Sequence, residues 1–428
     1  MGLPSALRAD AAAGRLVGRA PRPGDADITD PGFPLFLVTV LTFFPYLWPM
    51  EYTGLNKYWT FVPHLMFSIG LGLFHFLFWA FYRMLFPAVP VRLPAADTRF
   101  EHLFFHICRI AVFIAIAADA YLVALASTRL GDSMWARKAI VAEGGGVFIF
   151  TQLHVWFLGP FLALGLLQGR KVVLPVVILG VLAFLRAVLV SERLALIEFA
   201  IPVVVVLAMM GIVRVGWGRL VFLVLFVPIF FLCTEIFRSF YVKFVDVSGD
   251  WTGLSFEFVL AWNLERFFSY YADVTNKLYF MLSEQYFYIG DFWASGLTRI
   301  LARFGIGEIP EFLPIFHAFE RFGVRNVELT NPGGLQSFLA DFGWWGIGAY
   351  GLLIVLLLTA HRQMRLGRAF AYGAYPVLFV TFSDLVRLVY VYESRSVFPM
   401  ILFLLSYVAA RLFSLSHDTP RVRFRATA

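Results

Sequence analysis

Five arginines of this chain lie inside long apolar segments or in the connections beside them. They are Arg186, Arg193, Arg266, Arg387 and Arg395. A charged side chain in such surroundings is costly, so each is a candidate functional residue. Arginine stays charged when it is removed from water, and its planar guanidinium binds phosphate groups through two hydrogen bonds. The pattern predicts a site for an anionic ligand, and a polyprenyl pyrophosphate-linked sugar fits that description.

Three carboxylates accompany the arginines and are candidates for the catalytic group. They are Asp273, Asp341 and Glu393. Each could orient a sugar hydroxyl or accept its proton, and nothing in the sequence ranks them. Tyr270, close to Arg266, is a further candidate for substrate binding. Asp384 and Arg387 are three residues apart and would share one face of a helix, so a paired structural charge is the alternative interpretation of these two.

Motifs for metals and cofactors are missing from the sequence. It contains no C-x-x-C, H-E-x-x-H, EF-hand or Walker pattern. Cys108 and Cys233 lie in separate apolar segments and are expected to be small buried side chains. Five histidines are scattered over several apolar segments and are interpreted as polar core or interface residues: His64, His75, His102, His106 and His154. The sequence therefore predicts a site without a metal ion and without a cofactor.

The composition excludes an ordinary soluble protein. Of the 428 residues, 60% are hydrophobic and only 15% are charged, whereas about a quarter of the residues of soluble proteins are charged. Such a chain would expose more apolar surface than a monomer tolerates in water. The net charge of +7 comes from basic residues at the ends of apolar segments, which is typical of membrane topology rather than of nucleic-acid binding.

The elements that must position the charged residues are transmembrane helices. We predict spans near 34–50, 60–86, 103–126, 146–167, 172–190, 194–213, 220–238, 337–360, 373–392 and 397–416. At about 20 residues each, they match the thickness of a bilayer. An orientation with both termini in the cytoplasm leaves most basic residues on the inner side, as the positive-inside rule requires. The predicted fold is an all-α integral membrane protein of about ten transmembrane helices.

Polar segments complete the predicted organisation. Residues 1–31 are predicted to be a disordered cytoplasmic tail, and 417–428 a second cytoplasmic tail. Spans one to seven occupy 32–238, a large outer loop occupies 239–336, and spans eight to ten occupy 337–416.

The large outer loop is predicted to contain helices that lie on the membrane. Over 255–283 the apolar and aromatic positions recur at helical spacing and are interrupted by charges. This pattern is typical of an amphipathic helix at the membrane interface. A second such helix is predicted at 295–304, with Arg299 and Arg303 on its polar side. Long loops in compact proteins are usually lids or binding elements.

Three parts of the chain resemble the superfamily of O-antigen polymerases and ligases. The Ser191-Glu192-Arg193 turn is similar to the family's short outer turn between two mid-chain helices. The stretch from Arg266 to Asp273 resembles part of its large loop. The run from Asn331 to Gly346, where a small-residue turn precedes an acidic-aromatic-glycine sequence, resembles the family's entry into the next span.

This resemblance implies a metal-independent glycosyltransferase of the multi-span C type in the bacterial inner membrane. Its donor would be an undecaprenyl pyrophosphate-linked oligosaccharide, and it would act at the periplasmic face in the synthesis of O-antigen (lipopolysaccharide), capsule or exopolysaccharide. The implied partners are lipid-linked donor and acceptor, membrane lipids and a chain-length regulator. His317 is the only histidine in the large loop, which favours a polymerase over a ligase. The alternatives are that ligase and a transporter or flippase for a lipid-linked or anionic solute.

Overall fold

The computed structural model describes most of the predicted membrane segments. The described residues are 25–43, 60–86, 91–94, 98–128, 146–190, 192, 194–216, 255–285, 333–386, 389–392 and 394–416, with single residues at 46, 58, 233, 287, 298, 301 and 306. The predicted span at 220–238 and the second loop helix at 295–304 fall almost wholly outside these residues.

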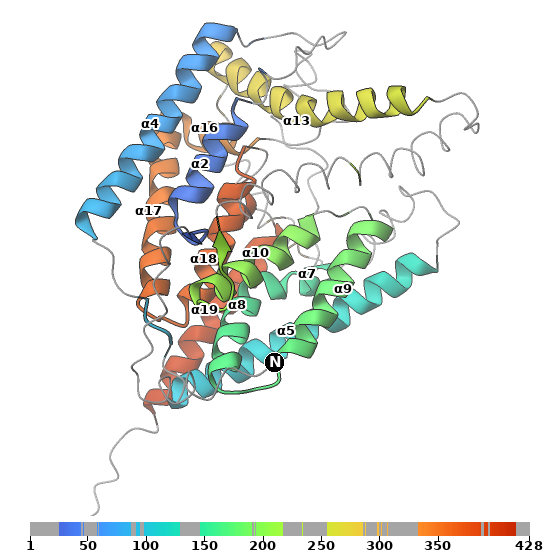
Figure 1. The fold of residues 1–428 in the computed structure, drawn as a ribbon, viewed down its shortest axis with the longest axis vertical. Helices are drawn as coiled ribbons and strands as arrows, with labels where there is room; N and C mark the ends of the chain where they lie inside the picture. The colour runs from blue at the N-terminus through green and yellow to red at the C-terminus, as the bar shows by residue number, and fades with distance from the viewer. Residues whose placement is uncertain are drawn as a thin grey trace, which may run out of the picture.

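Long helices make up the described chain (Figure 1). In the first half they are α2 (Gly32–Leu41), α4 (Phe61–Leu85), α5 (Arg99–Ser127), α7 (Gly146–Thr151), α8 (Leu153–Leu167), α9 (Val173–Leu189) and α10 (Leu194–Met209). In the second half they are α13 (Phe256–Glu284), α16 (Gly334–Phe342), α17 (Gly346–Arg365), α18 (Ala371–Ser383) and α19 (Ser394–Leu415), with short 3-10 turns η2 (Gly343–Trp345) and η3 (Tyr390–Tyr392). One antiparallel pair of two-residue strands, β1 (Asp25–Ala26) with β2 (Val215–Gly216), accompanies them.

Several of these helices can cross a membrane. Within the described part of the chain, five helical stretches are long and apolar enough to do so. They are Phe61–Leu85, Arg99–Ser127, Val147–Leu167, Gly334–Arg365 and Arg395–Leu415. Three shorter apolar helices, α2, α9 and α10, lie among them. The chain is therefore an all-α, multi-pass membrane protein.

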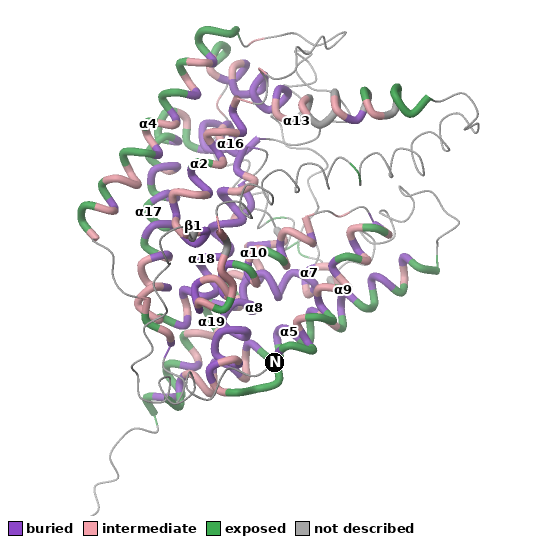
Figure 2. Tube along the Cα trace, viewed as in Figure 1, coloured by how far each residue is buried: buried purple, intermediate pink, exposed green. Residues whose placement is uncertain are grey.

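Helix α8 lies at the centre of the packed helices and is buried on all sides, as purple in Figure 2 indicates. A helix that is apolar all round is typical of a buried position, in a protein core or a membrane. Gly159 lets α18 approach closely, because a Cβ there would lie 1.9 Å from the carbonyl oxygen of Tyr372. Gly373 of α18 likewise faces the Trp156 carbonyl, at 2.5 Å from a Cβ. Small residues at such crossings are typical of packed membrane helices.

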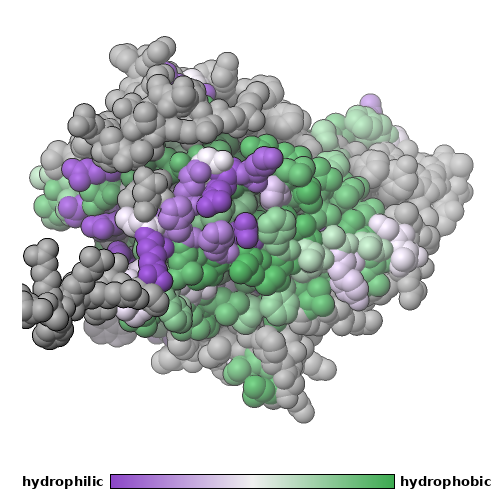
Figure 3. All heavy atoms as spheres, turned by 90° about the horizontal axis from the view of Figure 1, so that it is seen from below, coloured by the Kyte–Doolittle hydropathy of each residue, from purple (hydrophilic) through white to green (hydrophobic). Residues whose placement is uncertain are grey.

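The outer helices are apolar on their exposed faces. Helix α4 exposes Met66, Leu73, Leu77 and Met84, which in a bilayer would contact lipid. Seen from below, the molecule has a patch of hydrophilic residues bordered by broad hydrophobic surface (Figure 3). Helix α13 runs across the top of the molecule, steeply inclined to α4 and α17 (Figure 1).

Two expectations from the sequence need correction. Residues 25–31, assigned to a disordered tail, are ordered: β1 pairs with β2, and Asp30 forms an ion pair with Arg83 at the end of α4. The predicted continuous helix 373–392 is also wrong, because α18 ends at Ser383. A turn over 384–386 follows, so Asp384 lies beyond the end of the helix, and Arg387 is outside the described residues.

A tertiary contact accounts for the end of α18. The backbone N–H of Gly334, at the start of α16, donates to the carbonyl of Val386 at 3.3 Å. A Cβ at Gly334 would lie 1.7 Å from the Leu385 carbonyl oxygen. A helix that continued past Ser383 would use these carbonyls for its own hydrogen bonds. The contact with α16 replaces them.

Candidate functional site

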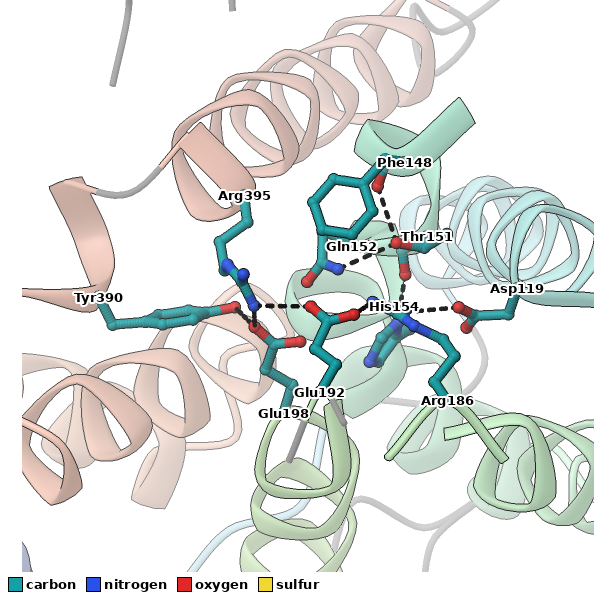
Figure 4. Close-up of polar contacts among 10 residues, drawn as sticks. All are labelled: Asp119, Phe148, Thr151, Gln152, His154, Arg186, Glu192, Glu198, Tyr390 and Arg395. Atoms are coloured by element: carbon teal, nitrogen blue, oxygen red, sulfur yellow. Dashed lines mark hydrogen bonds and ion pairs between the residues drawn. The ribbon is translucent and has the colours of Figure 1, made fainter. Parts of the chain in front are cut away.

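Arg186 is the most deeply buried arginine of the site, with 1% of its surface exposed. It lies in the last turn of α9 and makes two ion pairs. Its Nη1 donates to Asp119 Oδ1 of α5 at 2.5 Å, and its Nη2 donates to Glu192 Oε2 at 2.5 Å. Figure 4 shows these carboxylates on either side of the guanidinium. A buried guanidinium requires such partners, since one unpaired would be very unfavourable.

Glu192 joins this arginine to a second one, far away in the sequence. It lies in the short connection between α9 and α10, and its other oxygen, Oε1, accepts from Arg395 Nη1 at 3.0 Å. The same Arg395 nitrogen lies 3.3 Å from Glu198 Oε1 of α10. Tyr390 in η3 donates its hydroxyl to that Glu198 oxygen at 2.8 Å. We call Asp119, Arg186, Glu192, Glu198 and Arg395 the arginine network.

The network has more negative than positive groups. Two guanidiniums face three carboxylates, and Asp119 and Glu198 have no exposed surface. The negative charge of Glu192 is better neutralised than that of Asp119 or Glu198, because Glu192 contacts both arginines. Its burial would raise the pKa of its carboxyl, but Arg186 and Arg395 outweigh burial and hold that pKa below its ordinary value. Glu192 is therefore an anion at neutral pH, held between two cations.

Polar side chains at the junction of α7 and α8 border the network. The side-chain amide of Gln152 can hydrogen-bond to both sides of the network in one orientation. Its nitrogen then donates to Glu198 Oε2 at 2.8 Å, and its oxygen accepts from Arg186 Nη2 at 3.2 Å. His154 Nδ1 lies 2.6 Å from the Thr151 carbonyl. A carbonyl only accepts, so Nδ1 carries the proton and Nε2 has a lone pair.

Some buried atoms of this region have no hydrogen-bond partner among the described residues. They are Arg186 Nε, Asp119 Oδ2 and His154 Nε2. Buried polar atoms are nearly always paired, with protein, water or ligand. One hydrogen-bond donor, Arg186 Nε, and two acceptors, Asp119 Oδ2 and His154 Nε2, are thus available to a polar ligand or a water molecule.

Two of the predicted catalytic carboxylates lie elsewhere, on the neighbouring helices α13 and α16. Asp273 is buried and forms an ion pair with Lys277, one turn further along α13. Asp341 is 1% exposed in α16. Gln336 of α16 donates to the Val274 carbonyl of α13 at 3.1 Å and so ties the two helices together. We call Asp273, Lys277, Gln336 and Asp341 the α13–α16 cluster.

The connection between α18 and α19 contacts both α16 and the arginine network. At Leu385 and Val386 it packs against Gly334 at the start of α16. Four residues after Val386, the side chain of Tyr390 reaches Glu198 in the arginine network. The connection between α18 and α19 therefore contacts both the start of α16 and the arginine network.

The predicted site residues have separate outcomes. Arg186 and Arg395 meet at Glu192, as described. The backbone of Arg266 and Tyr270 lies in α13, and their side chains are outside the described part of the structure. Arg193, Arg387 and Glu393 lie outside the described residues. No three His, Cys, Asp or Glu side chains of the described ranges are grouped so that they could hold a metal ion.

Several members of the site were not predicted. Asp119 and Glu198 lie inside apolar segments, in the second half of the predicted third span and early in the sixth. The rule that marks any charge inside a span as a candidate site would have found both. His154 was interpreted as a core residue, and Gln152 and Tyr390 carry no sequence signal of their own.

Comparisons with known proteins give no relative. No family model matches the chain, and no curated protein and no solved structure is significantly similar to it. The function must therefore be argued from the chain itself.

Proposed function

We propose that this protein is a membrane glycosyltransferase that polymerises oligosaccharide units carried on a polyprenyl pyrophosphate. The observation that carries the proposal is the meeting of Arg186 and Arg395 at one carboxylate, at 2.5 and 3.0 Å. Two guanidiniums on either side of one carboxylate match a diphosphate, because each can bind one phosphate group. The resemblance of the Ser191-Glu192-Arg193 turn to that of O-antigen polymerases supports the same conclusion.

Glu192 occupies the position that the diphosphate would take. It is an anion between two cations, and 13% of its side chain is exposed. An incoming diphosphate would replace Glu192 on the two arginines, so that the arginines never lack an anionic partner. Arg186 would keep Asp119, and Arg395 would keep Glu198. Guanidiniums fixed in this way stabilise the charge of the leaving group without reorganisation.

The reaction would proceed by displacement at the donor sugar. A hydroxyl oxygen of the acceptor bonds to the anomeric carbon of the donor, and the bond from that carbon to the pyrophosphate oxygen breaks. Polyprenyl pyrophosphate leaves with the bonding electrons, and a carboxylate takes the hydroxyl proton. Asp273, Asp341 and Glu393 remain the candidates for that carboxylate.

The proposal includes a topology of ten spans, with both termini in the cytoplasm and 239–336 as a periplasmic loop. Contacts among basic helix ends support it. Arg411 of α19 lies over the ring of Phe100 in α5, 4.4 Å from its centroid. Arg83 and Arg365, at the ends of α4 and α17, both pair with the 27–30 segment. These residues belong to segments assigned to the inner side, which fits the positive-inside rule. The corresponding location is the bacterial inner membrane.

A direct test is polymerisation by the purified protein. Incubation with a lipid-linked repeat unit is expected to yield a ladder of chain lengths, and Arg395→Ala is expected to abolish most of it. Arg170→Ala is the matched control, since Arg170 is exposed in the turn between α8 and α9. Unchanged repeat units under conditions where the protein is folded and the donor is bound would contradict the proposal.

One observation favours the alternative of a transporter. The break after Ser383, followed by 3-10 turn η3, resembles the interrupted helices that transporters use to hold substrates. If the purified protein moves a labelled lipid-linked unit across the liposome membrane and forms no series of longer chains, a transporter is favoured over a polymerase.

A further inference from the structure

The buried face of α4 is polar, although the rest of this helix is apolar. Its buried residues include His64, Ser68, His75 and Tyr82, at spacings that place them on one face. Membrane helices usually associate through small residues and an occasional hydroxyl. Titratable side chains within a span are costly and characteristic of proton or ion pathways. We call these four residues and their partners on α2 and α17 the polar stripe.

The middle of the stripe is a hydrogen-bonded chain across three helices. His75 Nε2 lies 2.5 Å from the Tyr350 hydroxyl of α17, and His75 Nδ1 lies 2.8 Å from Thr39 Oγ1 of α2. Thr39 also lies 3.2 Å from the Leu35 carbonyl, to which its hydroxyl donates. His75 Nδ1 therefore donates to Thr39, and Nε2 accepts from Tyr350.

A second tyrosine–histidine pair follows, with the two residue types exchanged between the helices. The Tyr82 hydroxyl of α4 lies 2.9 Å from Nδ1 of His361 in α17. His361 and Ser68 have no exposed surface, and His361 Nε2 and Ser68 Oγ have no hydrogen-bond partner among the described residues. Buried polar atoms of this kind usually bind an ordered water.

The stripe is long enough to cross a membrane. From His64 to Tyr82 the helix rises by about 27 Å at ~1.5 Å per residue, close to the ~30 Å of a bilayer's hydrocarbon. Beyond Tyr82 lie the partly exposed ion pairs of Arg83 with Asp30 and of Arg365 with Asp27. At the other end His64 Nε2 contacts the Thr42 carbonyl at 2.8 Å, and the Tyr279 ring of α13 lies edge-on against it.

We propose that the polar stripe conducts protons through the membrane, an activity separate from glycosyl transfer. Histidine and tyrosine can each receive a proton on one side and release one on the other. When a proton joins His361 at Nε2, the ring releases its Nδ1 proton to the Tyr82 oxygen, and the Tyr82 hydroxyl proton passes to solvent water at the partly exposed ion pairs beyond it. Each group thus ends with as many protons as it began with. His75 would take a proton at Nε2 from Tyr350 and release its Nδ1 proton to Thr39, whose own proton leaves once that hydroxyl turns from the Leu35 carbonyl to water. Water at Ser68 and His361 would bridge the intervals between the paired groups.

Proton flux into liposomes tests this proposal. The purified full-length protein is reconstituted with a trapped pH-sensitive dye, and a potassium diffusion potential is imposed with valinomycin. Internal acidification is expected to be faster than in protein-free liposomes. Tyr350→Phe and His361→Phe should each slow it by roughly tenfold, the change that loss of one ordinary hydrogen bond in a rate-limiting step produces.

The control is His106→Phe, a change on α5 outside the stripe, which should retain wild-type flux. Tyr350→Phe leaves His75 Nε2 without its donor, so its melting temperature is expected to fall by a few degrees. Flux is therefore measured below that temperature, with an elution volume that matches the wild type, so that a loss of flux does not reflect unfolding. Wild-type flux no greater than that of protein-free liposomes would overturn the proposal. So would a folded Tyr350→Phe variant that conducts at the wild-type rate.

Discussion

Removing the charge of Glu192 should tighten the binding of a diphosphate, the opposite of what loss of a purely structural residue would do. In Glu192→Gln the side chain keeps its size, but its contacts with Arg186 and Arg395 lose one ionic partner. Both guanidiniums keep a second carboxylate, Asp119 and Glu198 respectively, so neither is left without a partner.

The structure sets the size of the effect. Glu192 accepts one hydrogen bond from each arginine, at 2.5 and 3.0 Å. A hydrogen bond to a charged group contributes ~1.5–3 kcal/mol and a neutral one ~0.5–1.5 kcal/mol, so each bond should weaken by about 1 kcal/mol. Two such bonds amount to about 2 kcal/mol, which corresponds to roughly thirtyfold in affinity for an anion that competes with Glu192. The ligand-free protein should be less stable by a similar amount, which lowers its melting temperature by a few degrees.

Inorganic pyrophosphate is the probe, titrated calorimetrically into the purified protein with a chelator present. The matched control is Glu284→Gln, which changes an exposed carboxylate at the end of α13 and should leave affinity and melting temperature unchanged. If Glu192→Gln binds pyrophosphate no more tightly than the wild type, the reasoning that Glu192 holds the position of the ligand is refuted.

Four further outcomes are expected. Arg395→Ala should slow polymerisation by roughly ten- to a hundredfold, and Arg395→Lys should restore it only in part, because an ammonium lacks the two-pronged contact; equal rates in Arg395→Ala and Arg170→Ala would contradict this. The melting temperature should fall on acidification below pH 4.5, the ordinary pKa of a glutamate carboxyl. The folded protein lowers the pKa of Glu192, so this group's contribution to stability is complete above pH 4.5 and is lost as the pH falls through the pKa of the folded state. Glu192→Gln should lack this part of the loss. A chelator should leave polymerisation intact, and recovery of a lost activity by a divalent cation would reveal a metal site. In a cysteine-free background, Glu284→Cys should react with an impermeant reagent from outside and Gln363→Cys only from inside, and labelling of both from one side would exclude the ten-span topology.

Helix positions could largely be predicted because the apolar runs are long and well bounded. The predicted 60–86 agrees with α4, 172–190 with α9, and 255–283 with α13. The break after Ser383 could not be predicted, because local residues such as Leu385 and Val386 are compatible with a helix. Their carbonyls face Gly334, some fifty residues earlier in the chain, and a pattern of local periodicity contains no such information.

Two arginines of the candidate site, Arg186 and Arg395, could be singled out from the sequence, but their partners could not. Arg186 and Arg395 stand out because cations near apolar segments are rare. Asp119 carries the same signal in the third predicted span, yet its pairing with Arg186 depends on how α5 packs against α9. The role of Glu192 between two arginines depends in turn on the approach of α19, which only the three-dimensional structure provides.

The most direct test of the account is an experimental structure with undecaprenyl pyrophosphate bound. The diphosphate is expected to lie within hydrogen-bond distance of both Arg186 and Arg395, with Glu192 displaced from the two guanidiniums. A diphosphate bound elsewhere on the protein, with Glu192 still bridging both arginines, would contradict it.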